Sequence, residues 1–179
     1  LEYARTLIDE NDYPIEIGSQ IVNHCFDDEP LTGGISTTML KDLSVEYVLV
    51  GHSEQRNFLM ESNNVITEKI QKALEDELSV IYCIGEDIDT KNKNETNLFL
   101  GEQLDILGQL QSTEEDKLRS ITVAYEPLWA IGSGLNAEKD YIVEIHEFIK
   151  KYINDQLGWG QQDIYPAVLY GGSVNLGNC

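Results

Sequence analysis

Short apolar runs rich in β-branched residues alternate along the chain with segments of helical period. Asn63–Leu78 and Ala137–Leu157 each repeat apolar residues along one helical face, and Ser36 is a suitable N-cap for a short helix over Thr37–Leu43. Alternation of strand and helix predicts an α/β fold with a parallel sheet, whose strands we expect to be buried mostly on both faces. The expected strands are Ile15–Val22, Val45–Val50, Val80–Ile84, Ile121–Tyr125 and Ala167–Tyr170.

Length and composition fit one domain. The chain has 179 residues, of which 41% are hydrophobic, enough for one sizeable core, so we treat residues 1–179 as a single domain. No apolar run approaches the ~20 residues of a membrane span, and no secretory signal pattern opens the sequence. We therefore expect a soluble, cytoplasmic protein.

The charge of the chain and the spacing of its cysteines and histidines exclude several classes of partner and site. Twelve basic residues stand against 32 acidic ones, and the formal charge of −20 repels nucleic acids and anionic membranes. The three cysteines are far apart and odd in number, and His24 and His146 have no metal-ligand company at useful spacing. We expect no disulfide framework and no metal site.

Two polar clusters follow expected strands and carry the chemistry. Glu126 directly follows one strand, and His52 and Glu54 follow another within Gly51-His52-Ser53-Glu54. A carboxylate base that removes a proton beside a carbonyl needs an electrophile on the resulting oxyanion, and an imidazole supplies it. Small residues in Gly132-Ser133-Gly134 and Gly171-Gly172-Ser173 would let backbone N–H groups approach a phosphate, although neither stretch matches a nucleotide-binding motif.

The order of these motifs resembles the triosephosphate isomerase family. The resemblance runs nearly end to end and includes Thr32-Gly33 with Ile35-Ser36 before the second expected strand. The motifs that carry it are Gly51-His52-Ser53-Glu54, Cys83-Ile84-Gly85-Glu86, Tyr125-Glu126-Pro127-Leu128-Trp129-Ala130-Ile131-Gly132 and Tyr170-Gly171-Gly172-Ser173-Val174-Asn175.

The resemblance implies the (β/α)8 barrel that takes its name from this family, and interconversion of dihydroxyacetone phosphate and glyceraldehyde 3-phosphate without a cofactor. Glu126 would shuttle the proton, neutral His52 would polarise the carbonyl, and Glu54 would support the site. The amides of Gly132 and Ser173 would hold the phosphate under a lid formed by Leu128–Gly134. The loop Asn23–Gly34 would pack into a second subunit of a homodimer.

The match is incomplete. A barrel of this kind needs about 250 residues and eight strands, and about five strands are legible here. By resemblance, Leu1–Asp9 matches the helix after the second strand, so we expect a fragment lacking the first two strands and the last, inactive by itself. Two alternatives stay open: a truncated product that binds or complements another chain, and a barrel isomerase acting on another phosphorylated sugar.

Overall fold

The computed structural model describes residues 1–23, 31–110, 113–131, 137–174 and 176. Its elements, in chain order, are α1 (Glu2–Asn11), β1 (Gly18–Ser19), α2 (Thr37–Asp42), β2 (Tyr47–Val50), α3 (Ser53–Phe58), α4 (Asn63–Glu75), β3 (Ser79–Ile84), α5 (Ile88–Asn92), α6 (Thr96–Gly108), α7 (Glu115–Leu118), β4 (Ile121–Tyr125), the 3-10 turn η1 (Leu128–Ala130), α8 (Lys139–Lys151), the π-helical turn η2 (Tyr152–Gln156), the 3-10 turn η3 (Trp159–Gln162) and β5 (Val168–Tyr170).

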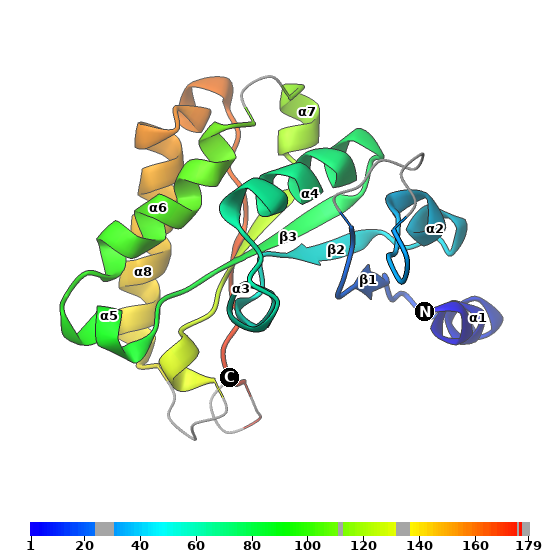
Figure 1. The fold of residues 1–179 in the computed structure, drawn as a ribbon, viewed down its shortest axis with the longest axis horizontal. Coiled ribbons are helices and arrows are strands. Elements are labelled where there is room, and N and C mark those ends of the chain that lie inside the picture. Colours follow the sequence, from blue (N-terminus) through cyan, green and yellow to red (C-terminus); the bar gives the residue numbers. More distant parts are fainter. Residues whose placement is uncertain (24–30, 111–112, 132–136, 175, 177–179) are drawn as a thin grey trace.

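The five strands form one parallel sheet in the order β1-β2-β3-β4-β5. This sequential order, with helices in the connections, confirms the expected α/β fold and matches part of a (β/α)8 barrel. The helices α4, α6 and α8 contact the sheet, and Figure 1 shows α6 and α8 side by side at one end and α1 at the other, beside β1.

The expectation that the strands are buried mostly on both faces fails for β2, whose burial alternates, whereas β3 and β4 have consecutive buried residues towards their carboxyl ends. In β2, Val48 and Val50 are buried whereas Tyr47 and Leu49 are only half-buried. The buried side chains join one core with the helices, because each helix turns an apolar stripe towards the sheet. The core includes Val48, Val80, Tyr82 and Val123 from the strands, Ile66 and Ile70 from α4, Leu100 and Leu104 from α6, and Ile145 and Ile149 from α8.

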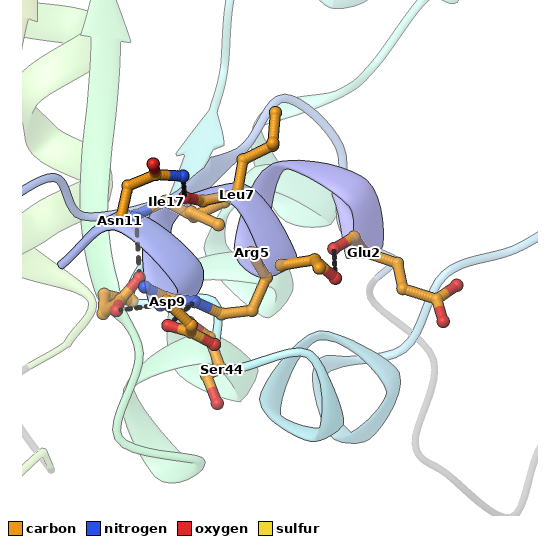
Figure 2. Close-up of polar contacts among 9 residues, drawn as sticks. Glu2, Arg5, Leu7, Asp9, Asn11, Ile17 and Ser44 are labelled. Atoms are coloured by element: carbon orange, nitrogen blue, oxygen red, sulfur yellow. Dashed lines mark hydrogen bonds and ion pairs between the residues drawn. The ribbon is translucent and has the colours of Figure 1, made fainter. Parts of the chain in front are cut away.

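Helix α1 is held by polar contacts. It has no buried residue, and Tyr3 keeps 75% of its surface exposed. Arg5 donates to Glu46 at 3.0 Å and to the carbonyl of Ser44 at 3.3 Å. Figure 2 shows these contacts, together with the hydrogen bond of 2.8 Å that the N–H of Ile17 donates to Glu46. One arginine therefore ties α1 to the carboxylate that also fixes the backbone just before β1.

Among the described residues, none of the helices combines the length and the apolar composition that crossing a membrane requires.

Two helices begin at a serine whose hydroxyl caps the first turn. The Ser36 hydroxyl accepts the N–H of Met39, which confirms the expected N-cap of α2, and the Ser62 hydroxyl accepts the N–H of Val65 in the same way at α4.

Candidate active site

The sheet register brings the polar strand ends to one edge. Val50 pairs with Tyr82, and Tyr125 pairs with Ile84 on one side and Tyr170 on the other. The residues that follow these strands therefore meet at the carboxyl edge, where parallel α/β sheets hold their ligands. His52 and Glu126, 74 positions apart in the sequence, come together there: Nε2 of His52 lies 3.3 Å from Oε1 of Glu126.

His52 is the N-cap of α3, and this position fixes its tautomer. Its Nδ1 accepts the backbone N–H of Glu54 at 3.3 Å. A ring nitrogen that accepts a hydrogen bond carries no proton, so the neutral ring has its hydrogen on Nε2, the atom nearest Glu126. The ring can then act as a hydrogen-bond donor towards the position that faces the carboxylate.

Glu54 contributes more through its backbone than through its side chain. Its Oε2 lies 4.0 Å from Nδ1 of His52, and 72% of the side chain is exposed. The sequence-based assignment of Glu54 as a supporting residue stays a prediction, and the contact that supports His52 directly is the amide.

Glu126 is buried, with only 6% of its surface exposed. Burial raises the pKa of its carboxyl group, and the nearby His52 ring and the Ser53 N–H oppose this shift. A carboxylate with a raised pKa holds a proton more strongly than an ordinary glutamate, which suits a general base that must remove a proton from carbon.

Two glycines let the backbone close around Glu126. A Cβ at Gly85 would lie 1.8 Å from the Glu126 carbonyl oxygen, and one at Gly171 would lie 2.8 Å from Cγ of Glu126. The N–H of Glu126 donates to the carbonyl of Ile84 and the N–H of Gly171 donates to the carbonyl of Tyr125, both at 2.7 Å. Gly171, which the sequence associates with a phosphate, therefore also packs against Glu126.

Cys83 points to the same carboxylate. It is 1% exposed, and burial followed by the negative charge of Glu126 raises the pKa of its thiol. The thiol therefore stays protonated at neutral pH. The expectation of a core thiol at this position is confirmed, while Cys25 and Cys179 lie outside the described residues.

A buried carboxylate beneath the expected lid was missed by the sequence reasoning. Glu86 is fully buried. The hydroxyl of Tyr125 lies 3.0 Å from each of its oxygens, and Oε1 also accepts from Nε1 of Trp129 at 2.9 Å and from the Tyr141 hydroxyl at 3.0 Å. The Lys91 ammonium covers this cluster, 3.3 Å from the ring centroid of Trp129. The three donors come from β4, η1 and α8, so no local sequence pattern could have predicted this cluster.

The start of the expected lid forms the turn η1, directly after Pro127. The Ser173 hydroxyl donates to the carbonyl of Ala130 at 3.2 Å, so Ser173 lies at the base of this segment. Gly132, the other predicted phosphate-binding residue, and the lid positions 132–134 lie outside the described residues. The phosphate-binding roles of Gly132 and Ser173 stay predictions.

Groups of three or more His, Cys, Asp or Glu side chains that could hold a metal ion do not occur within residues 1–23, 31–110, 113–131, 137–174 and 176. The chemistry that the described geometry supports is acid–base: a buried carboxyl group facing Nε2 of an imidazole ring.

Comparison with known proteins identifies the family of the chain. The family model described as triosephosphate isomerase matches residues 2–179. The chain is 42% identical over 148 residues to a triosephosphate isomerase of Neurospora crassa, covering 83% of this chain and 58% of that protein. It is 41% identical over 150 residues to one of Dictyostelium discoideum, covering 83% of this chain and 56% of that protein.

A bacterial relative extends the match. A triosephosphate isomerase of Dictyoglomus turgidum is 38% identical over 170 residues, which cover 93% of this chain and 66% of that protein. The chain thus spans between 56% and 66% of the length of these relatives. On the family match and these identities, the chain belongs to the triosephosphate isomerase family.

Proposed function

We propose that the protein carrying this sequence interconverts dihydroxyacetone phosphate and D-glyceraldehyde 3-phosphate. The observation that carries the proposal is the pairing of Glu126 with the Nε2–H side of His52 at 3.3 Å. This reaction needs a base for a carbon-bound proton and a hydrogen-bond donor for the oxygen that becomes negative, and these two side chains supply both.

In the proposed reaction, the Glu126 carboxylate removes a proton from the carbon next to the substrate carbonyl. The electron pair of that C–H bond forms a C=C bond, and the carbonyl oxygen takes up the negative charge of an enediolate next to Nε2–H of His52. Glu126 then returns the proton to the neighbouring carbon, while a proton moves between the two oxygens, so atoms and charge balance without a cofactor. The raised pKa of Glu126 supports both directions of this transfer.

The phosphate of the substrate would be held by the amides of Gly132 and Ser173, beneath a lid formed by Leu128–Gly134. Lid closure, for which this family is a standard example, keeps water from the enediolate. Backbone amides suit this task in a chain of charge −20, because they attract a dianion without requiring many cations.

We further propose that the protein acts as a homodimer in the cytoplasm, in glycolysis and gluconeogenesis.

The test is a matched pair of variants of the full-length protein. Glu126→Gln removes the base and keeps the shape, and we expect kcat to fall by at least about a thousandfold with the fold retained. Glu115→Gln makes the same chemical change at an exposed position on α7 and should leave kcat unchanged. Near-normal turnover in the first variant would refute the role of Glu126.

The substrate class needs a separate assay. A panel of phosphorylated aldoses and ketoses of three to six carbons should give turnover with the trioses only, since the lid must close around the whole substrate. Turnover with a longer sugar phosphate, and none with the trioses, would assign the site to another barrel isomerase.

A further inference from the structure

One buried tyrosine lies between the loops that carry His52 and Glu126. Tyr82 occupies the middle strand, β3, paired with Val50 of β2 and Val123 of β4, and it is fully buried. The two loops follow those neighbouring strands directly. A polar group in the core at this position must find its hydrogen-bond partners within the protein.

On the His52 side, the Tyr82 hydroxyl accepts a hydrogen bond of 3.0 Å from Nη2 of Arg56. The same guanidinium donates from Nε to the carbonyl of Gly51 at 2.8 Å. Gly51 has φ +75°, and a Cβ there would lie 3.0 Å from the Tyr82 ring. The residue directly before His52 is therefore held between the Tyr82 ring and the Arg56 side chain.

On the Glu126 side, the Tyr82 hydroxyl donates to the backbone carbonyl of Gln103 at 2.7 Å. The Gln103 side chain in turn accepts the N–H of Gly85 at 2.9 Å and donates to the carbonyl of Gly85 at 3.4 Å. Gly85 is the glycine that packs against the backbone of Glu126. A continuous series of hydrogen bonds thus runs from Gly51 through Arg56, Tyr82 and Gln103 to Gly85.

The hydroxyl of Tyr82 is the one atom group that belongs to both halves of this series. Burial raises its pKa to about 12, so it keeps its proton at neutral pH and can accept from Arg56 while donating to Gln103. A phenylalanine would fill the same space and do neither.

We propose that Tyr82 is a positioning residue whose hydroxyl, through Arg56 and Gln103, fixes the separation and orientation of His52 and Glu126. It touches neither side chain and acts through the backbone of Gly51 and Gly85. The catalytic value of a fixed spacing rests on the proposed isomerase function, because the general base and the electrophile must both face one substrate. The hydrogen-bonded series from Gly51 to Gly85, called the brace below, does not depend on that function.

The test compares Tyr82→Phe with Tyr165→Phe. Tyr165 is an exposed tyrosine whose hydroxyl makes a long contact of 3.5 Å to the Gly160 carbonyl, so its variant removes the same atom outside the brace. NMR of labelled protein follows the ring nitrogens of His52 at neutral pH and the titration of the Glu126 carboxyl carbon. In Tyr82→Phe we expect the pKa of Glu126 to fall towards the ordinary range as water enters, and the His52 ring to show a mixture of tautomers. Tyr165→Phe should match the wild type.

A folded Tyr82→Phe protein with wild-type signals for both residues would overturn the proposal. Should that variant fail to fold, Gln103→Met removes the clamp on Gly85 while leaving the Tyr82 contact to the Gln103 carbonyl. We then expect the Glu126 signal to change, and an unchanged signal in Gln103→Met would likewise overturn the brace.

Neither NMR signal needs turnover, so the brace is tested separately from the isomerase proposal. In the active protein, we expect Tyr82→Phe to lower kcat by about tenfold with KM changed by less than about twofold, since misplacement of catalytic groups affects the chemical step. A kcat equal to that of Tyr165→Phe would overturn the positioning role.

Discussion

Replacing Glu86 tests how much the buried carboxylate beneath η1 contributes to stability. Three side chains donate to it, namely Tyr125, Trp129 and Tyr141. Glu86→Leu removes the acceptor of these three hydrogen bonds, and the loss of such a bond by a buried donor costs about 1–3 kcal/mol. Tyr141 keeps a contact of 3.5 Å to the Thr96 hydroxyl, and Trp129 is only half-buried, which favours the lower end of that range. The expected loss in free energy of unfolding is about 3 kcal/mol.

Glu86→Gln separates hydrogen bonding from packing. Its amide oxygen can still accept from Trp129 and Tyr141 at the position of Oε1, and its NH₂ group can donate to the Tyr125 hydroxyl once that hydroxyl rotates. We expect a loss of only about 1 kcal/mol, because the bonds from Trp129 and Tyr141 remain with a neutral acceptor and only the Tyr125 hydroxyl proton loses its acceptor on residue 86.

Thermal unfolding distinguishes the two variants. At about 2–4 °C per kcal/mol for a chain of this size, the expected decrease in Tm is roughly 6–12 °C for Glu86→Leu and roughly 2–4 °C for Glu86→Gln. Glu68→Leu and Glu68→Gln, at an exposed position on α4, are the matched controls and should differ from wild type by no more than about 0.5 kcal/mol. Equal Tm values for the two Glu86 variants would show that the donors find other partners, which would refute the reasoning.

Three further measurements test other contacts. Arg5→Ala should raise the hydrogen-exchange rates of α1 while lowering global stability by no more than about 1 kcal/mol, because Arg5 carries the polar anchor of a helix without buried residues; unchanged protection would contradict this. Burial, followed by the charge of Lys150, lowers the pKa of His146, so the unfolded chain binds this proton at higher pH than the folded one. Stability should therefore decrease as the pH falls below about 6.5, and His146→Gln should flatten that part of the curve of Tm against pH, whereas an identical slope would exclude a contribution from His146. Iodoacetamide should leave Cys83 unmodified in the folded protein and alkylate it in urea, because burial keeps the thiol protonated; equal rates by mass spectrometry would argue against this.

The sequence predicted best those elements whose pattern is local. The expected strand Ile121–Tyr125 matches β4 residue for residue, and β3 differs by one residue at its start. The expected strand Ile15–Val22 was too long, since only Gly18–Ser19 pairs with β2. An edge segment can be apolar without making a ladder, and composition does not distinguish the two cases.

The sequence pattern also misjudged the extent of one helix and missed another. The segment expected as one helix over Ala137–Leu157 is α-helical only over Lys139–Lys151 and continues as the π-helical turn Tyr152–Gln156. Helix α6 was not predicted, because its apolar residues lie around much of its circumference, including the exposed Leu98 and the buried Leu100 and Ile106. Such a helix lacks the single stripe that pattern reasoning detects.

For the site, motif order located His52 and Glu126 at one edge of the sheet, and the structure brings them within 3.3 Å. The contacts of Glu86 and Tyr82 could not be predicted from the sequence, because their partners lie between 21 and 55 positions away. Long-range hydrogen bonds depend on how helices and strands pack, and a single sequence carries no direct record of that packing.

The packing of Gly85 and Gly171 against Glu126 has an evolutionary consequence. Because the backbone of two residues without side chains packs directly against this glutamate, single substitutions of its other neighbours can alter the polarity of its surroundings but have little scope to relocate it. Substitutions in the surrounding loops can therefore accumulate while the glutamate keeps its place. Changing that position would require replacing a glycine or altering the length of a loop.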